Sequence, residues 1–434
     1  MNSNITKTLI TITAILIFVI SAVGIYKYFA SKTAVPTSSE GESTTNVFPE
    51  SDKVISLDSA DSSQVDGRET QTSPTRTNQT DNLDVKIVSE RPVAGAVFEE
   101  RQEFQSKNKK LYAKYMERES GHVFLLADNA NLPQKISNTT VTRVYQSFFN
   151  NTGTDILIRR LDENNNVQNI SAVIETKAKA TSTDVFTEDM IGKLNQSLLS
   201  ANIKEVVVSP DKDKIFYLTE VGGDFIGTVE DFGKQKSPSI KRQVFGSPLG
   251  EWQIEWPANN TMFFNTKPSI NVPGFLFSQS LNKNSFTKIL GGVNGLASKV
   301  SPGLKKFVYS ESVSDGVQTY IYDLIKKERA LLPLKTLPEK CVWGGIEKEV
   351  LYCAVPKELP KGDYPDSWYQ GLVSFDDELW MVDTKTGSSL LLADKSALGR
   401  NEGIDAIDLS LSPSEEYLLL TNKKDSSLWQ VRLK

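Results

Sequence analysis

The stretch VVVSPDKDKIFYL, residues 206–218, decides the fold that the sequence predicts. Two runs of branched and aromatic side chains flank a polar turn with a proline, which is the pattern of a short β-hairpin. Similar stretches follow it along the chain: QIEWPANNTMFF (253–264), SKVSPGLKKFVYS (298–310), CVWGGIEKEVLYC (341–353) and LSLSPSEEYLLL (409–420). Two weaker copies precede it, EFQSKNKKLYAKY (103–115) and QSFFNNTGTDILIRR (146–160).

The spacing of these hairpins indicates the architecture. Their turns recur roughly every 45 residues, a period that is typical of β-propeller blades. Further short strands follow the hairpins, such as TYIYDL (319–324) and ELWMVD (378–383). Helical solenoids would instead show helical periodicity within each unit. Seven copies predict an all-β, seven-bladed β-propeller, with six or eight blades as the alternatives.

The last repeat lacks its fourth strand. It provides three strand segments before Lys434, whereas LDVKIVSERPVAGAVF (83–98) has the form of a fourth strand and the loop into a new blade. We therefore expect a propeller over residues 83–434 in which the N-terminal strand completes the last blade. Such sharing would remove the unpaired edge that a broken ring leaves.

The N-terminal part of the chain has a different composition. Residues 8–26, TLITITAILIFVISAVGIY, carry no charge and lie between Lys7 and Lys27. A helix of that length reaches about 28 Å, close to the hydrocarbon thickness of a bilayer. Residues 1–30 are therefore predicted to be a single-pass membrane anchor; a cleavable signal peptide is the alternative. Residues 31–82 are rich in Ser, Thr, Asp and Glu and are expected to be a disordered linker.

Several segments carry a resemblance to known proteins. The hairpins with an SP turn are similar to WD40-like and TolB-like repeats. SERPVAGAVF (89–98), YMERESGHVFLL (115–126), KISNTTVTRVYQSFF (135–149) and the stretch from Tyr352 to Asp383 resemble a family of uncharacterised, membrane-anchored bacterial β-propeller proteins. The resemblance implies the fold and implies no activity. The GH and WD dipeptides of WD40 proteins are missing, so it does not imply their hydrogen-bonded tetrad.

The two cysteines, Cys341 and Cys353, begin and end the hairpin of the sixth repeat. A loop centred on Glu347 places them opposite each other, and opposed Cα atoms lie about 4.5–5.5 Å apart, within reach of a disulfide. We expect this disulfide; the alternative is two reduced core cysteines in a shifted register. A disulfide indicates an oxidising compartment. It would place the propeller on the extracytoplasmic side of the cytoplasmic membrane. The lysines on the two sides of the anchor do not decide this orientation.

The sequence contains few candidates for catalysis or metal binding. No G-x-S-x-G, H-E-x-x-H or Walker motif is present, and His122, the single histidine, lies in a predicted hairpin turn. A net charge of −5 without a basic stripe excludes a typical nucleic-acid binder. We predict a non-enzymatic binding or scaffolding module without cofactor or metal. A cell-wall or glycan-active enzyme that uses paired carboxylates is the alternative.

Two insertions interrupt the repeat. The first, residues 176–204, contains DMIGKLNQSLLS (189–200), whose apolar spacing predicts a short helix packed on the ring. The second, residues 356–377, lengthens the sixth blade, and long loops on a rigid scaffold often bind partners.

We predict that the second insertion contacts an envelope protein or polymer. The candidate site residues are two aromatic and three acidic side chains: Asp366, Trp368, Tyr369, Asp376 and Asp377. In the alternative, Trp368 packs inward on its own blade and the acids are solvated turn residues.

Overall fold

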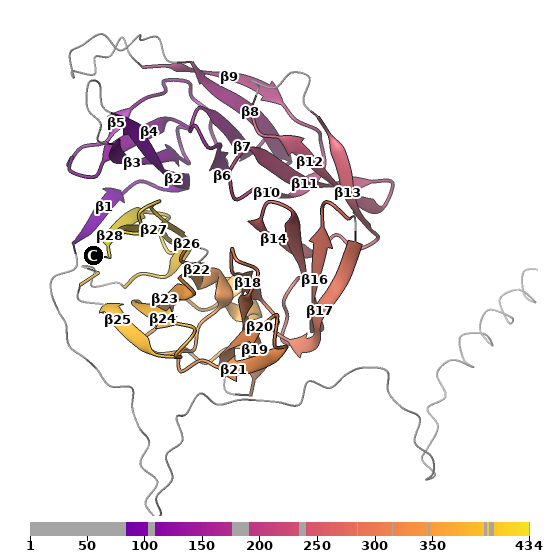
Figure 1. The fold of residues 1–434 in the computed structure, drawn as a ribbon. Coiled ribbons are helices and arrows are strands. Elements are labelled where there is room, and N and C mark those ends of the chain that lie inside the picture. Colours follow the sequence, from indigo (N-terminus) through magenta and orange to yellow (C-terminus); the bar gives the residue numbers. More distant parts are fainter. Residues whose placement is uncertain are drawn as a thin grey trace, which may run out of the picture. The chain divides into compact units, whose positions relative to one another are not determined.

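The computed structural model describes residues 84–433 apart from residues 103–108, 176–190, 234–239, 284, 315, 346–347, 395–396 and 399–402. In this part of the chain the strands form seven four-stranded antiparallel sheets around a ring (Figure 1). The predicted all-β, seven-bladed propeller is therefore confirmed. The predicted anchor and linker lie outside the described residues. None of the described helices is long and apolar enough to cross a bilayer.

The first four blades follow the chain in order. Blade 1 contains β2 (Val93–Gln102), β3 (Lys109–Glu117), β4 (Val123–Ala127) and β5 (Gln134–Lys135). Blade 2 contains β6 (Val144–Phe149), β7 (Asp155–Leu161), β8 (Val167–Glu175) and β9 (Lys193–Leu198). Blade 3 contains β10 (Ile203–Val208), β11 (Lys214–Val221), β12 (Asp224–Asp231) and β13 (Arg242–Ser247). Blade 4 contains β14 (Trp252–Ala258), β15 (Thr261–Thr266), β16 (Pro273–Ser280) and β17 (Ser285–Asn294).

The remaining blades include both ends of the propeller. Blade 5 contains β18 (Ser298–Val300), β19 (Lys306–Val313), β20 (Gly316–Asp323) and β21 (Glu328–Leu331). The 3-10 helix η2 (Pro338–Lys340) leads into blade 6, which contains β22 (Cys341–Trp343), β23 (Val350–Pro356), β24 (Asp377–Asp383) and β25 (Ser389–Ala393). Blade 7 contains β26 (Ala406–Leu411), β27 (Tyr417–Asn422), β28 (Leu428–Arg432) and β1 (Val85–Ser89). Blade 7 thus contains the strand that the last repeat lacks.

The hydrophobic core lies between neighbouring blades. On β19, Phe307 and Tyr309 pack toward blade 4, whereas Val308 between them packs toward blade 6. Successive side chains of a strand point to opposite faces of its sheet, so both faces of blade 5 are buried. Strands buried on both faces need nearly continuous apolar runs, which explains sequences such as KFVYS in the repeats.

The hairpin of blade 6 contains the predicted disulfide. Cys341 pairs with Cys353 in the register between β22 and β23, and their Cα atoms are 4.1 Å apart. The two sulfur atoms are bonded, so the expected disulfide is confirmed. Both cysteines are buried in the core between blades 5 and 6.

The prediction of a helix within residues 189–200 is wrong. Lys193–Leu198 instead forms β9, the outer strand of blade 2, which pairs antiparallel with β8. Leu194 is buried and Leu198 is 70% exposed, so the apolar residues do not share one buried face. The edge of β8 offers backbone partners to this segment, and the resulting ladder outweighs the weak helical pattern.

Closure of the ring by β1 gives a first prediction. Deleting residues 84–91 removes β1 and leaves the edge of β28 unpaired, so we expect a lower melting temperature and aggregation on size-exclusion chromatography. Deleting residues 31–80 serves as the control and is expected to change neither. Equally stable monomers from both deletions would show that the ring does not need β1.

Candidate functional site

The insertion of blade 6, residues 356–377, contacts three other blades. It includes the short helix α2 (Asp366–Tyr369). The backbone N–H of Ile270, in the loop between β15 and β16 of blade 4, donates to Asp366 Oδ2 at 2.7 Å. On blade 5, Ser312 Oγ donates to the carbonyl oxygen of Tyr364 at 2.5 Å. On blade 7, Lys423 Nζ donates to the carbonyl oxygen of Trp368. The insertion therefore ties blades 4 to 7 together.

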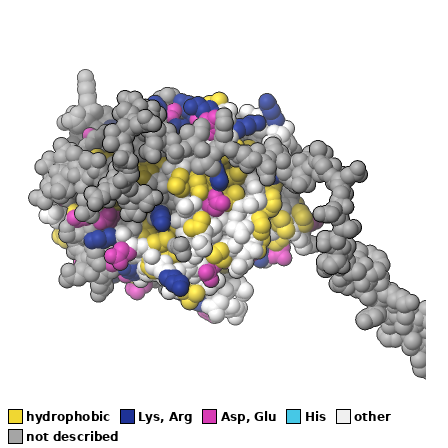
Figure 2. Space-filling view, turned by 90° about the horizontal axis from the view of Figure 1, so that it is seen from below, with side chains coloured by type: hydrophobic (Ala, Val, Ile, Leu, Met, Phe, Trp, Pro, Cys, Tyr) yellow, Lys and Arg dark blue, Asp and Glu magenta, His cyan; other side chains and the backbone are white. Residues whose placement is uncertain are grey.

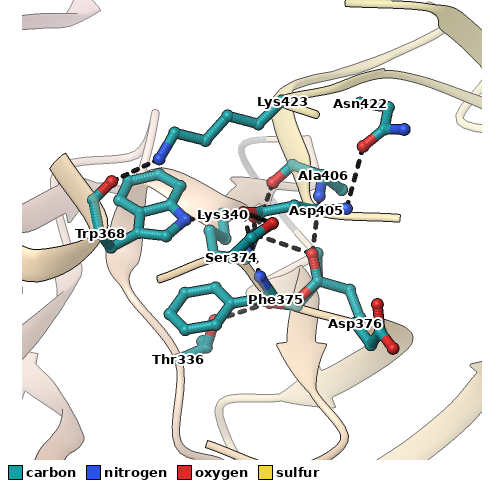
Figure 3. A network of polar contacts seen from close by, with 12 residues as sticks. Thr336, Lys340, Trp368, Ser374, Phe375, Asp376, Asp405, Ala406, Asn422 and Lys423 are labelled. Atoms are coloured by element: carbon teal, nitrogen blue, oxygen red, sulfur yellow. Dashed lines mark hydrogen bonds and ion pairs between the residues drawn. The ribbon is translucent and has the colours of Figure 1, made fainter. Parts of the chain in front are cut away.

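Trp368 packs inward. Its side chain is 4% exposed and stacks on Phe375 with ring centroids 5.9 Å apart. Its indole Nε1 donates to Asp405 Oδ2 at 3.0 Å, and Lys423 Nζ lies 4.1 Å from the ring centroid (Figure 3). This arrangement matches the alternative in which the tryptophan orders its own loop, because a buried indole presents no surface to a partner.

Asp377 is part of a buried charge network. The alternative in which the acidic residues are solvated turn residues is therefore wrong for Asp377. Its Oδ2 atom lies 2.7 Å from Lys340 Nζ, which also lies 2.6 Å from Asp405 Oδ1. All three side chains are at most 1% exposed. Burial raises the pKa of Asp377 to about 6, although Lys340 opposes the shift.

The remaining predicted residues also have partners within the protein. The hydroxyl of Tyr369 contacts Glu339 and accepts a hydrogen bond from Gln253 Nε2 at 3.0 Å. Burial, together with Glu339, raises the pKa of Tyr369 well above its ordinary value. Asp376 is paired with Lys424 at 2.7 Å, and its side chain is 40% exposed. The interpretation of the five residues as a partner site stays a prediction.

A second group of charged residues lies at the centre of the ring. Figure 1 shows that the first strand of each blade lies nearest the centre, and neighbouring inner strands from β14 to β26 contact each other. Lys299 on β18 attracts both Glu255 on β14 and Asp408 on β26. β14, β18 and β26 are the inner strands of blades 4, 5 and 7, so the three residues lie on strands that border the ring centre. We call Glu255, Lys299 and Asp408, with Arg118 after β3, the axial cluster.

The surroundings of the axial cluster favour neutral carboxyl groups. Burial raises the pKa of Glu255 to about 7, opposed by Lys299 and by the backbone N–H of Val300, which donates to Glu255 Oε2 at 2.8 Å. Surrounding protein also raises the pKa of Asp408 by partial desolvation, opposed by Lys299 and Arg118. Removing a carboxylate from water disfavours its charge, so desolvation outweighs these attractions.

Asp408 has an unusual backbone conformation for its residue type. Its φ is 53°, and the pairing of β26 with β27 shifts register between Ile407 and Ser410. Bulges of this kind redirect a side chain out of the regular alternation. The side chain of Asp408 is exposed, although surrounding protein raises its pKa, which fits a position facing the ring centre.

Sequence reasoning missed the axial cluster, although a signal was present. Asp408 lies five residues before the turn proline Pro413, and Glu205 lies five residues before Pro210. The inner strands of the repeats are otherwise apolar, so a carboxylate at the same position of two of them departs from the pattern expected of buried strands. Burial raises the pKa of Glu205 as well, opposed by Arg159. The sequence could flag these acids, but only the ring brings Asp408 and Glu255 to one lysine.

The axial cluster combines hydrogen-bond donors and acceptors of both charges. A carboxyl with a pKa near 7 can donate or accept a proton at neutral pH, and Lys299 and Arg118 can bind an anionic or hydroxyl group. The described residues include no group of three or more His, Cys, Asp and Glu that could hold a metal ion. The cluster is thus suited to binding polar groups and, through Glu255, to proton transfer.

Comparison with known proteins finds no family and several distant structural neighbours. The sequence matches no known family description and no curated protein. Among solved structures, oligogalacturonate lyase from Vibrio parahaemolyticus is 10% identical over 81% of this chain and 99% of its own, with a TM-score of 0.46. The β-propeller domain of the Trilobed protease from Pyrococcus furiosus is 11% identical over 78% of this chain and 98% of its own, with a TM-score of 0.43.

TolB from Acinetobacter baumannii is 10% identical over 78% of this chain and 79% of its own, with a TM-score of 0.36. The structural neighbours therefore include TolB-like propellers, as the repeats predicted. At these identities and TM-scores, the similarities carry no argument about activity.

The raised pKa of Glu255 gives a second prediction. The folded protein binds a proton at Glu255 more tightly than the unfolded chain, so the free energy of unfolding falls as pH rises from about 4.5 through 7. Glu255→Gln removes this dependence and keeps an oxygen for Val300. We expect the variant to be more stable than the unchanged protein by up to about 3 kcal/mol at pH 8, with little difference at pH 4.5.

Urea unfolding at several pH values measures this effect. Glu251→Gln is the matched control, because Glu251 lies in the same segment and its side chain is 76% exposed. The control is expected to follow the pH dependence of the unchanged protein. Parallel curves for Glu255→Gln and the unchanged protein would contradict the prediction.

Proposed function

We propose that this protein is a membrane-anchored, extracytoplasmic binding or scaffolding propeller that contacts an envelope protein or polymer and is not an enzyme. The observation that carries the proposal is the mutual pairing of charges at the ring centre. Lys299 attracts both Glu255 and Asp408, and Arg118 attracts Asp408. Side chains of these types suit polar contacts with a partner, because they offer both hydrogen-bond donors and acceptors.

The disulfide supports the proposed location. Disulfides persist in oxidising compartments and are rare in the cytosol, so Cys341–Cys353 fits a propeller outside the cytoplasm. The apolar run of residues 8–26 would then hold the protein at the cytoplasmic membrane. Together these features favour a partner within the cell envelope.

The exposed part of the insertion is the proposed contact surface. Leu372 is 73% exposed, and Val272 in the loop of blade 4 is 60% exposed. The hydrogen bond between Ile270 and Asp366 joins the two segments that carry them. Exposed apolar side chains on two loops that are tied together can bind a partner with little loss of conformational entropy.

The contact surface gives a third prediction. Leu372→Ala with Val272→Ala should reduce recovery of an envelope partner after mild crosslinking, since truncating anchors of this kind costs about 2 kcal/mol or more in binding. Melting should change little, because both side chains are exposed. Trp368→Ala is the matched contrast: removing its buried side chain should cost about 3–5 kcal/mol of stability. Full recovery of the partner by the double variant would contradict the proposed surface.

The raised pKa of Glu255 favours one second candidate, a cell-wall or glycan-active enzyme. Glycosidases pair a protonated carboxylic acid with a carboxylate, and the axial cluster contains two carboxyl groups, of which Glu255 has its pKa raised to about 7.

Release of reducing sugar ends from purified cell-wall polymer by the full-length protein separates the two candidates. We expect no release above a protein-free control. Release that is lost in both Glu255→Gln and Asp408→Asn would overturn the non-enzymatic proposal.

A further inference from the structure

Lys340, Asp377 and Asp405 form the most deeply buried charged group that we find in the described residues. Lys340 Nζ is within 2.7 Å of one oxygen of each aspartate, and the three side chains are at most 1% exposed. Two carboxylates and one ammonium leave an unbalanced charge in the interior if all three are ionised. Burying such a group costs several kcal/mol per ion unless the protein compensates it.

Aromatic side chains lie next to the ammonium group of Lys340. Its Nζ atom lies 5.2 Å from the ring centroid of Trp368 and 5.1 Å from that of Phe375. Among the described residues, Nζ also donates to the carbonyl oxygen of Ala406 at 2.9 Å. A buried, weakly polar environment favours the neutral forms of an amine and a carboxylic acid over their ions.

The two aspartates differ in how well their charge is stabilised. Asp405 accepts hydrogen bonds from Trp368 Nε1, from Ser374 Oγ and from the backbone N–H of Phe375, in addition to Lys340 (Figure 3). These donors fix the orientation of the Asp405 carboxyl group beside Lys340 Nζ. Asp405 is therefore suited to accept a proton from Lys340.

Asp377 has fewer donors. Its Oδ2 atom accepts from the backbone N–H of Ala406 at 2.7 Å and from Lys340. Its Oδ1 atom is buried and has no hydrogen-bond partner among the described residues. The raised pKa of Asp377 increases the fraction of the protein in which this carboxyl group carries a proton. Lys340 thus contacts one aspartate with several further donors and a second whose Oδ1 atom has no partner among the described residues.

We propose that Lys340 and Asp377 form an intramolecular isopeptide bond. Asp405 takes one proton from the Lys340 ammonium, and the neutral amine attacks Cγ of the protonated Asp377. The new C–N bond replaces the C–O bond to Oδ1, the amine gives up a second proton, and Oδ1 leaves as water. Asp405 ends protonated, so charge and atoms balance without an oxidant, a reductant or a cofactor.

The bond would reinforce blade 6. It would join the last residue of η2 to the first residue of β24, enclosing the disulfide hairpin and the whole insertion in one covalent loop. The reaction removes the buried charges of Lys340 and Asp405, which provides its driving force. The inference does not depend on the proposed binding function.

Intact mass spectrometry of the full-length chain, unfolded and with the disulfide reduced, tests the proposal directly. We expect a mass lower than that of the sequence by one water. Digestion with trypsin should yield a branched peptide that joins Lys340 to Asp377, since trypsin does not cleave after an acylated lysine. The full sequence mass would overturn the proposal, and a branch at Asp405 would overturn the assignment of the two aspartates.

Variants identify the role of each residue. Lys340→Arg keeps a cation but lacks the amine and should have its full mass. Asp377→Asn should lose ammonia instead of water, because the carboxamide nitrogen becomes the leaving group. Asp405→Asn removes the proton acceptor and should leave most of the chain unlinked.

Lys114→Arg is the control, since Lys114 is another buried lysine paired with a carboxylate, Glu99, and should keep the water deficit. A deficit of one water in Lys340→Arg would contradict the proposed bond. The mass of the unchanged chain decides the question even if a variant fails to fold.

Discussion

The pairing of β1 with β28 is the interaction on which the rest of the propeller depends. Val85 lies opposite Val431 and Ile87 opposite Trp429, so a strand from the start of the propeller completes its last sheet. Each blade buries both faces against its neighbours, and an open ring would expose one face at each end. Closure therefore allows every blade to have two partners, and β1 becomes the outer strand of the last sheet.

The insertion of blade 6 reinforces the same ring by a different kind of contact. Its hydrogen bonds reach blades 4, 5 and 7, and its interior contains Lys340, Asp377 and Asp405 rather than a purely apolar core. Buried ion pairs contribute little net stability, but they require one geometry, since a displaced partner leaves an uncompensated charge. The main effect of the network is thus to fix the position of the loop. Its contribution to the free energy of unfolding is small.

The axial cluster follows from the symmetry of the ring. Inner strands bring equivalent positions of all blades toward one centre, so residues far apart in the sequence, such as Glu255 and Asp408, share one cation, Lys299. Their enclosure explains why desolvation dominates their titration. Functional sites of propellers built in this way use the scaffold for position and a few polar side chains for chemistry.

The sequence by itself determined the architecture, because hairpin period, strand count and the facing of Cys341 and Cys353 are local or repetitive properties. It failed for residues 189–200, where pairing with β8 outweighed a weak helical pattern. It identified the insertion but left the inward packing of Trp368 as one of two alternatives, since Asp405 and Lys423, which contact that side chain, come from blade 7. Burial and charge pairing between blades depend on distances that the sequence does not encode locally, and only the tertiary structure decided them.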